Sequence, residues 1–589
     1  MNNKLRIGAF GAVMTALLLV YSCKDSFLVV PVTGQLDAKL LSGKLGLDAA
    51  IISAYSQING RFNRMGSPSN WVWGSIRGGE ANKGTDPGDF SDINPIQRYE
   101  ALPTQGVISD KYNSNYEVAA RANAVLKLLV TASADVTTAD KTSFEAQAKF
   151  LRGHAYFELK RAFGNTPYID ETVDVGSGIE KVKNDVDLWP KIEADFQFAA
   201  ANLPATQGQV GRVNAWAAKA YLAKVYMYQG KFAAAKTLFD DIIANGKTSN
   251  GKTYGLNPQY ADVFKASNDN NAESVWAYQA AANTGSVNNA NPEFDLNWPY
   301  NTGADGPGNC CSFFQPTFAM GNSFRTDAGG LPLLDGSFNL GVNQVKTDMG
   351  LESSAAFTPD AGNLDPRIDH SIGRRGIPYL DWKDFPGKDW IRNQPNAGPY
   401  QTKKYAYYKS DKGSLQDNST WTPGYTAINY TIIRYADVLL MAAEAEIEVG
   451  SLGTALNYIN QVRNRATNPA GFVQKGGAPA ANYVINTYTT LGSQANARTI
   501  VRFERLVELS GEGHRFFDLM RWTLADGNGK TGKGLLNDYI AYEKDKYPSG
   551  AFAGISFTNN QDELLPIPQS QIDIVGADIL KQNPGYGGN

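Results

Sequence analysis

The sequence predicts a mainly α-helical protein in which paired helices form a scaffold and carry one large insertion, rich in loops and aromatic residues, with short strands. Three observations support this fold class. Four segments have apolar residues at helical spacing. Two of these segments repeat one arrangement of small and large apolar residues around a central glycine. Residues 247–430, which lie between those two, lack such spacing and are rich in Gly, Asn, Pro and aromatic residues.

The N-terminal segment has the pattern of an export signal. Lys4 and Arg6 precede a small and apolar stretch, residues 7–20, and Cys23 follows it after Tyr21 and Ser22. This arrangement resembles a bacterial lipoprotein signal, which implies a signal peptide at residues 1–22 and lipidation of Cys23 after cleavage. The alternative is an ordinary secretory signal with an incidental cysteine. No later stretch approaches the roughly 20 apolar residues of a spanning helix, so we expect a domain tethered to a membrane by acyl chains.

The first helical block is residues 142–164. Its apolar side chains recur at spacings of three or four, which places them on one face of a helix. Gly164 is expected to end this helix, and Asn165, Thr166 and Pro167 to turn the chain. The apolar stripe consists of Phe144, Ala148, Leu151, Ala155, Leu159 and Phe163.

The second and third blocks, residues 214–246 and 435–466, predict two similar helix pairs. The helices of each pair meet at a glycine, Gly230 or Gly450. Small residues seven before and five after that glycine allow close approach, and larger ones fill the seam. These offsets match a tetratricopeptide repeat, so an α-solenoid is expected; two unrelated helical hairpins are the alternative. The matched positions are Ala223, Ala235, Phe239 and Ile242 in one block and Ala443, Ala455, Ile459 and Val462 in the other.

The fourth block, residues 499–522, is a further helix that Gly511 and Gly513 are expected to break or kink. The predicted organisation is thus a signal peptide at 1–22, a first helical part at 23–246, an irregular ligand-binding insertion at 247–430 and a second helical part at 431–589. A structureless loop as long as 247–430 would be abnormal. We therefore expect a subdomain with short strands, mounted on the helices, where binding residues tend to lie.

Charge and motifs argue against several functions. The chain has 55 basic and 58 acidic residues and no polybasic run, so nucleic acid is not an expected partner. Zinc-protease, nucleophile-elbow and P-loop motifs are absent. The charged residues near the fourth block are expected to pair and fix helix packing: Arg434, Asp437, Glu508, Arg515, Asp518 and Arg521. Asp86, Asp89 and Asp92 predict a solvated acidic loop, with a calcium site as the alternative.

Taken together and in order, these segments resemble the SusD/RagB family of outer-membrane nutrient-binding lipoproteins. The resemblance covers most of the mature chain. Its carriers are Phe27-Leu28 with Pro31, Thr33 and Gly34; Phe150-Leu151-Arg152 through Phe163-Gly164; Arg434-Tyr435-Ala436-Asp437 with Ala443-Glu444-Ala445; Val462-Arg463-Asn464-Arg465-Ala466; Glu504-Arg505 through Glu512-Gly513-His514-Arg515 and Asp518 to Trp522; and Leu565-Pro566-Ile567-Pro568 with Asn583-Pro584-Gly585-Tyr586.

The resemblance implies a TPR-like, SusD-like scaffold and a lipoprotein anchored in the outer membrane, facing the cell surface. It also implies a partner, a SusC-like TonB-dependent barrel, over which the protein acts as a lid that captures an oligosaccharide. No cofactor and no catalysis are implied. The alternatives are a lid that captures peptides, a purely structural lid and a surface glycosidase, which would need only two suitably spaced carboxyls.

Trp71 and Trp73, followed by Asn82, form the first candidate ligand site. Aromatic rings suit the apolar faces of sugars, and amides suit the hydroxyl rim. Because the two tryptophans alternate, they would share one face of an extended strand. The resemblance places ligand contacts in this segment, whereas packing of both rings in the core is the alternative.

Cys310 and Cys311 form the second candidate site. If Cys23 is acylated, these two cysteines can pair only with each other within the chain. Adjacent Cα atoms lie about 3.8 Å apart across a trans peptide, which is below the usual disulfide range, yet export favours oxidation. The hypothesis is a disulfide that lines the binding face; free or structural thiols are the alternative. Nearby positions expected on this face are Trp298, Tyr300, Trp382 and Trp390, and the Cys-Cys-Ser-Phe-Phe-Gln-Pro-Thr segment is similar to segments of SusD-like relatives.

Overall fold

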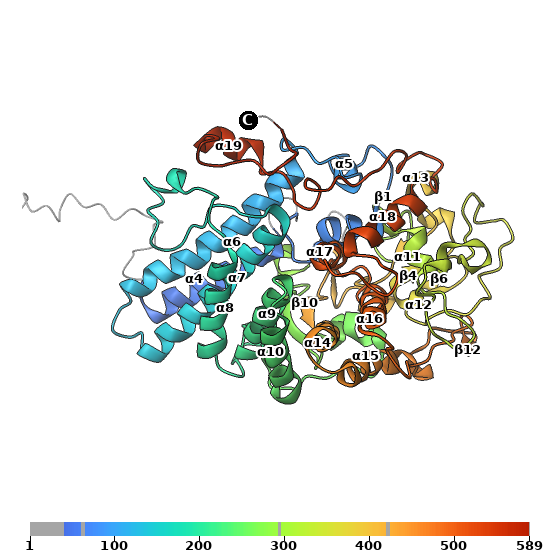
Figure 1. The fold of residues 1–589 in the computed structure, drawn as a ribbon, viewed down its shortest axis with the longest axis horizontal. Helices are drawn as coiled ribbons and strands as arrows, with labels where there is room; N and C mark the ends of the chain where they lie inside the picture. Colours follow the sequence, from blue (N-terminus) through green and yellow to red (C-terminus); the bar gives the residue numbers. More distant parts are fainter. Residues whose placement is uncertain (1–40, 61–64, 292–295, 420–423, 588–589) are drawn as a thin grey trace, which may run out of the picture.

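The structure, a computed structural model, describes residues 41–60, 65–291, 296–419 and 424–587. The predicted signal peptide and Cys23 lie outside these ranges. Within them, no helix combines the length and apolar character that crossing a bilayer would require. The chain is mainly helical, with the long helices of the N-terminal part at one side, the loops of the insertion at the other, and the C-terminal helices next to the insertion (Figure 1).

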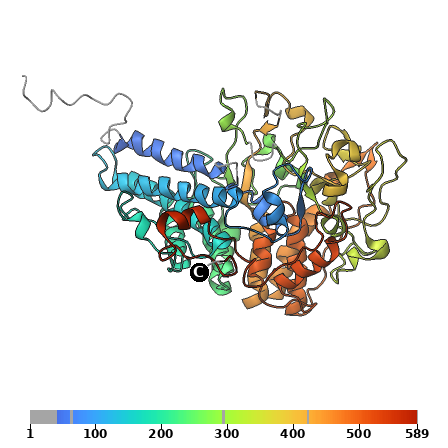
Figure 2. The same cartoon turned by 90° about the horizontal axis from the view of Figure 1, so that it is seen from above.

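Consecutive long helices pack side by side along the scaffold. Each of α6 to α9 contacts the next, α10 contacts α14, and α14 contacts both α15 and α16. This succession joins the two predicted helical parts into one continuous layer although the insertion separates them in sequence (Figure 2). The long helices are α4 (Lys44–Ser56), α6 (Gly106–Val130), α7 (Thr138–Phe163), α8 (Trp189–Asn202), α9 (Ala215–Tyr228), α10 (Phe232–Asn245), α14 (Tyr435–Val449), α15 (Leu452–Ala466), α16 (Gln494–Glu508) and α18 (Gly532–Glu543).

The predicted helical blocks are confirmed, with local signals at their ends. Helix α7 begins four residues earlier than predicted, because Thr137 and Asp140 form a reciprocal cap that satisfies free backbone N–H groups. It ends at Gly164, which has a φ of 73°. The pairs α9–α10 and α14–α15 meet at Gly230 and Gly450 as expected.

The predicted seams between paired helices form the centre of the core. Ala223 and Ala235 are 0% exposed, and so are Ala443 and Ala455. Small side chains at these positions let the helix backbones approach, and the larger seam residues Phe239, Ile242, Ile459 and Val462 are also fully buried. The TPR-like fold class is therefore confirmed.

The insertion consists of short helices, turns and two-stranded sheets. Strand β2 (Ser274–Tyr278) pairs with β10 (Tyr430–Arg434), and β1 (Ala81–Gly84) pairs with β3 (Phe313–Pro316), both antiparallel. The remaining strands are β4 (Ile372–Gly373), β5 (Pro378–Tyr379), β6 (Lys383–Asp384), β7 (Gln401–Thr402), β8 (Gln416–Asp417), β9 (Tyr425–Thr426), β11 (Gln474–Lys475) and β12 (Ala478–Pro479). The shorter helices are α5 (Ile93–Gln97), α11 (Phe318–Asn322), α12 (Ile368–Ser371), α13 (Gln394–Ala397), α17 (Arg515–Arg521) and α19 (Gln569–Val575).

A buried ion-pair network fastens the insertion to the scaffold. The Glu508 carboxylate is 2.6 Å from Arg434 Nη1 and 2.9 Å from Arg367 Nη1, and it also pairs with Arg465. Arg434 in turn pairs with Glu512 at 2.7 Å. Since these side chains are almost fully buried, the network confirms the structural role predicted for this charged segment.

The other charged residues predicted to pair near the fourth block also form buried ion pairs, with Arg515 as the exception. Asp437 pairs with Arg505 at 2.7 Å, and Asp518 pairs with Arg521 at 2.8 Å. The Arg515 guanidinium instead lies over the Trp522 ring, 5.5 Å from its centroid.

Candidate functional site

Four aromatic residues that the sequence analysis placed near the cysteines lie in two groups: Trp298 and Trp382 pack on Tyr407, and Tyr300 contacts Trp390. The Tyr407 ring centroid lies 5.4 Å from that of Trp298 and 5.8 Å from that of Trp382. The indole N–H of Trp382 donates to the Tyr407 carbonyl at 3.1 Å. The backbone N–H of Tyr300 donates to the carbonyl of Trp390 at 2.8 Å. The structure thus brings these four positions together, although they are up to 92 residues apart.

Cys310 and Cys311 are joined by a disulfide, one of the two alternatives that the sequence left open. The peptide bond between them is cis and their Cα atoms lie 3.0 Å apart, closer than the trans spacing from which the sequence argument started. Cys311 forms a parallel bridge with Trp298, and Ser312 donates its N–H to the Trp298 carbonyl at 2.9 Å. The disulfide is therefore part of the aromatic cluster.

Close packing of Trp298 and Trp390 requires glycine at positions 308 and 306, just before the cysteines. A Cβ atom at Gly308 would lie 2.4 Å from Cβ of Trp298, and Gly308 has a φ of 68°, in the left-handed region. A Cβ atom at Gly306 would lie 2.7 Å from the Trp390 ring. Both tryptophans thus pack directly against backbone, which explains the Gly-Pro-Gly sequence of this loop.

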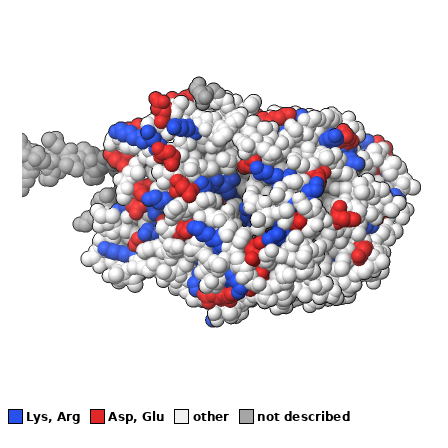
Figure 3. Space-filling model, in the orientation of Figure 1, with Lys and Arg blue, Asp and Glu red and all other residues white. Residues whose placement is uncertain are grey.

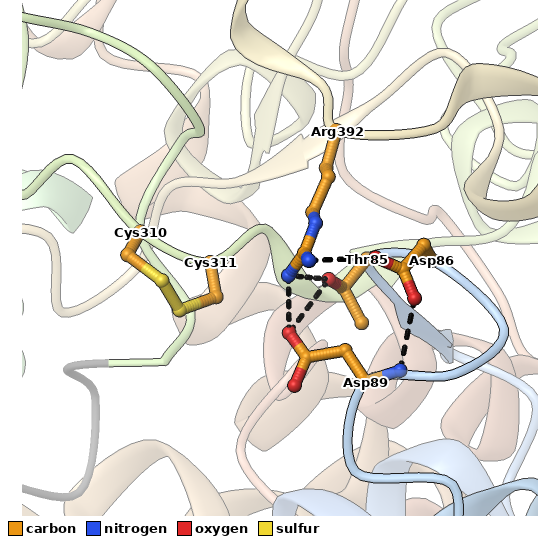
Figure 4. Close-up of a disulfide and its surroundings, with 6 residues drawn as sticks. All are labelled: Thr85, Asp86, Asp89, Cys310, Cys311 and Arg392. Carbon is orange, nitrogen blue, oxygen red and sulfur yellow. Dashed lines mark hydrogen bonds and ion pairs between the residues drawn. A yellow bond between two sulfur atoms is a disulfide. The ribbon is translucent and has the colours of Figure 1, made fainter.

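Arg392 forms a charged rim beside the disulfide (Figure 4). Its Nη2 lies 2.7 Å from the Asp86 carboxylate, and its Nη1 pairs with Asp89 and donates to Thr85 Oγ1 at 3.2 Å. The guanidinium carbon lies 5.6 Å from the centroid of the Tyr300 ring. The rim therefore joins the 85–89 loop, which precedes the insertion, to the aromatic cluster within it.

Thr85 holds this junction in an unusual conformation. Its φ is 49°, which is rare for a β-branched residue, and its N–H donates to the Ser312 carbonyl at 2.6 Å. Ser312 and Phe314, which follow the disulfide, also have positive φ values of 65° and 55°. Clustered backbone strain of this kind is typical of functional sites.

Exposure divides the gathered residues into two layers. Trp298 and Trp390 are 1% and 2% exposed, and Cys311 is also buried, so they support the surface from below. Tyr300, Cys310 and Trp382 are only partly buried. The side chains that a ligand could touch are therefore these three together with Arg392, whose side chain is 31% exposed.

Trp71 and Trp73 do not form the predicted aromatic face. They lie in the π-helix η2 (Trp71–Ile76), not in an extended strand. Two residues along a helix point to nearly opposite sides. Trp71 therefore packs against the rings of Phe313 and Phe314, while the Trp73 indole donates to the Met65 carbonyl at 2.7 Å. Both rings are at most 4% exposed, so core packing, the alternative, describes them.

Asn82 also lies below the surface. It is 1% exposed, and its side-chain amide donates to the Ala397 carbonyl at 2.8 Å and to the Tyr547 hydroxyl at 3.3 Å. Strand β1 pairs Asn82 with Gln315 of β3, four residues after Cys311. This segment therefore positions the cysteine loop from beneath, and the fold leaves Asn82 no direct access to a ligand.

The 86–92 loop packs around two basic side chains, those of Lys83 and Arg392. Lys83 Nζ donates to the backbone carbonyls of Asp86 and Asp89 at 2.8 and 2.6 Å. Arg392 forms ion pairs with the carboxylates of the same two aspartates. Burial lowers the pKa of Lys83 to about 8. Among the described residues, no group of three or more His, Cys, Asp or Glu side chains is arranged to hold a metal ion.

The Asp86 carboxyl of the rim is poorly suited to acid catalysis. Burial acts to raise the pKa of Asp86, but N–H groups of Asp89 and Gly88 and the Arg392 charge hold it below its ordinary value. A glycosidase needs a general acid whose pKa is raised. Burial does raise the pKa of Glu80 and of Glu543 to about 7, yet these side chains are 3% and 0% exposed.

A cavity of about 380 Å³ lies elsewhere, between the end of α4 and strand β2. Its volume is within the range of ligand pockets. Two of its polar groups have partners outside the lining: Arg212 pairs with Asp48 at 2.7 Å, and the Gln279 amide exchanges hydrogen bonds with Asn270. Asn59 Oδ1 and Trp276 Nε1 have no hydrogen-bond partner among the described residues. The surface over the disulfide is the candidate site because partly buried aromatic side chains and the Arg392 guanidinium meet there beside the disulfide.

Charge over the molecule is mixed, and Lys and Arg side chains alternate with Asp and Glu on the face drawn in Figure 3. Sequence reasoning missed Arg392, Thr85 and Tyr407. Their only local signals were an isolated arginine, an unremarkable threonine and a tyrosine within the run Tyr405 to Tyr408. Their roles depend on contacts between segments that are far apart in the chain.

Comparisons with known proteins agree with this architecture. The family model described as SusD family matches residues 272–586, and a second, described as starch-binding associating with outer membrane, matches residues 86–227. The SusD-like protein P2 of Formosa agariphila is 26% identical over 538 residues, which cover 90% of this chain and 91% of that protein.

Solved structures share the fold. A SusD superfamily protein from Bacteroides vulgatus superposes with a TM-score of 0.66 at 22% identity, over 92% of this chain and 99% of that one. Surface glycan-binding protein A from Bacteroides thetaiotaomicron, in complex with laminarihexaose, superposes with a TM-score of 0.62 at 20% identity and the same coverage. Since the first family model spans more than half of the chain, this protein belongs to the SusD family.

Proposed function

We propose that this protein is a surface glycan-binding lipoprotein, which captures an oligosaccharide and delivers it to a SusC-like TonB-dependent transporter in the outer membrane. The observation that carries the proposal is the surface over the Cys310–Cys311 disulfide. Partly exposed aromatic side chains, Tyr300 and Trp382, lie there beside a guanidinium, that of Arg392.

This combination suits sugar recognition. A pyranose ring has an apolar C–H face that stacks on aromatic side chains, and its hydroxyl groups accept hydrogen bonds from N–H donors. The disulfide adds a compact, polarizable apolar group at the same level. Its buried supports, Trp298 and Trp390, hold the surface in place, which limits the ordering cost of binding. The laminarihexaose complex of a structural relative supports a glycan as the ligand class.

The capture step can be tested by native affinity electrophoresis of the mature protein in gels that contain neutral polysaccharides, with laminarin, starch and xyloglucan as probes. We expect retardation by at least one polysaccharide without release of reducing ends. Released reducing ends would support the glycosidase. Neither retardation nor cleavage would support a peptide-capturing or purely structural lid.

The position of the site can be tested by substitution. Tyr300→Ala and Trp382→Ala should each weaken binding by about tenfold, equivalent to about 1.4 kcal/mol. Trp216→Ala is the matched control, because Trp216 is a partly buried tryptophan on scaffold helix α9. Binding that is unchanged in both site variants, or lost equally in the control, would refute the placement.

Delivery requires a tether and a barrel. We expect the full-length protein to purify from outer membranes together with a SusC-like barrel. Cys23→Ser should release the protein from the membrane but leave polysaccharide retardation unchanged, since Cys23 lies outside the proposed surface. Release of the wild type in detergent-free buffer would contradict lipid anchoring, and its purification without a barrel would contradict delivery.

A further inference from the structure

The charged groups around the disulfide are paired with one another. Arg392 binds the carboxylates of both Asp86 and Asp89. On the other side of the surface, Lys383 lies 2.8 Å from Asp305 and 5.3 Å from the centroid of the Trp390 ring. Both of these cations are therefore paired with carboxylates, and among the described residues nearby one cation is an exception.

The exception is Lys409, an exposed residue that follows Tyr408. Its backbone N–H donates to the Asp381 carboxylate at 2.5 Å, which places an anion next to its own residue. Around the disulfide and Trp382, four carboxylates then face four cations: Asp86, Asp89, Asp305 and Asp381 against Arg392, Lys383, Lys409 and the buried Lys83. Among these described residues the positive charges do not outnumber the negative ones, so they offer no surplus of positive charge with which to hold a polyanion.

Arg392 nevertheless keeps hydrogen-bond donors. A guanidinium has five N–H groups, and the contacts of Arg392 with Asp86, Asp89 and Thr85 use three. Its Nε and a remaining Nη hydrogen have no partner among the residues that the structure describes. These donors can bind the hydroxyl oxygens of a neutral sugar, whereas a sulfate or carboxylate would approach against the charges of Asp86 and Asp89.

We propose that the Asp86–Arg392–Asp89 cluster makes this surface selective for neutral oligosaccharides and excludes glycans that carry uronate or sulfate groups. This inference rests on the proposed function and specifies its substrate class. The two aspartates do more than fix a loop: they cancel the charge of the Arg392 guanidinium beside the disulfide and leave two of its N–H donors for a ligand.

The test compares a neutral polysaccharide with its chemically sulfated product in native affinity gels at low salt. The polysaccharides used are laminarin, starch and xyloglucan. The full mature protein should bind at least one neutral form and bind the sulfated form at least about tenfold more weakly. Asp86→Asn with Asp89→Asn should reduce this discrimination by about tenfold. Asp174→Asn with Asp185→Asn, in the loop between α7 and α8, is the matched control because it changes the net charge equally and far from the site; it should retain the discrimination of the wild type.

Salt dependence and a third variant separate charge cancellation from loop folding. Retardation of the double variant by the sulfated form should fall steeply with salt, as expected for an ion pair. Arg392→Gln should weaken neutral binding and leave the sulfated form excluded. Equal binding of both forms by the wild type, or unchanged discrimination in the folded double variant, would overturn the inference while the proposed function stands. Failure of the wild type to bind any form would overturn both.

Discussion

Glu508→Gln is expected to be among the most destabilising single substitutions in this chain, because one buried carboxylate serves three guanidinium groups. Glu508 is 0% exposed and pairs with Arg434 at 2.6 Å, with Arg367 at 2.9 Å and with Arg465. Removing one partner of a buried ion pair costs about 3–5 kcal/mol. With three cations left facing one another, we expect a loss of about 5 kcal/mol in the free energy of unfolding.

The measurement is urea unfolding at pH 7, read as the free energy of unfolding for the wild type and the variant. Asp538→Asn is the control, because Asp538 forms a surface pair with Lys530 at 2.9 Å and its side chain is 56% exposed. Such pairs are worth about 0–1 kcal/mol. A loss in Glu508→Gln no larger than that of the control would refute the view that this network fastens the insertion to the scaffold.

The same network predicts how the difference in free energy of unfolding between the wild type and Glu508→Gln depends on pH. Burial acts to raise the pKa of Glu508, but the charges of Arg465, Arg434 and Arg367 outweigh it and hold the pKa well below its ordinary value. A carboxyl with a lowered pKa stabilises the fold above its unfolded pKa and loses that contribution as the pH falls. The gap between wild type and Glu508→Gln should therefore shrink below about pH 4, by about 1.4 kcal/mol per pH unit. A gap that widens in acid would contradict this.

Three further substitutions or measurements test the site and its supports. Gly308→Ala should abolish polysaccharide binding, because its Cβ would collide with Trp298 in a left-handed backbone conformation, and electrophoretic retardation equal to that of wild type would contradict it. Trp73→Ala should lower the free energy of unfolding by about 3–5 kcal/mol as a core truncation, whereas Trp382→Ala should cost much less; calorimetry compares the two, and similar losses would refute the assignment of layers. Intact mass of a mature form lacking Cys23 should rise by two hydrogen atoms on reduction, and an unchanged mass would show that Cys310 and Cys311 are free thiols.

The helical scaffold could be predicted because its signals are local. Apolar residues at spacings of three or four, with glycines at the turns, define α9–α10 and α14–α15 within a few residues. The break between α16 and α17 was also visible, since Gly511 and Gly513 both adopt positive φ. These signals act over one helical turn, so they can be read without knowledge of the rest of the chain.

The first candidate site was wrong for a reason that lies outside its own segment. Alternating Trp71 and Trp73 fit a strand as well as a core helix. What decides between them is a contact with a distant turn: a Cβ atom at Gly74 would lie 1.8 Å from the Gly513 carbonyl oxygen. This close approach places the segment inside the molecule, where both rings are buried. The sequence around Trp71 and Trp73 does not indicate this contact, because Gly513 lies far away along the chain.

The sequence by itself determined the paired helices, the family and the grouping of aromatic residues near Cys310 and Cys311, because periodicity and motifs are written along the chain. Only the tertiary structure decided which side chains reach solvent and which charges meet. Arg392 and the aspartates of the 85–89 loop lie about 300 residues apart in sequence, yet they meet beside the disulfide. Electrostatic pairing depends on distance in space, so the charge of the proposed glycan surface could be known only from the fold.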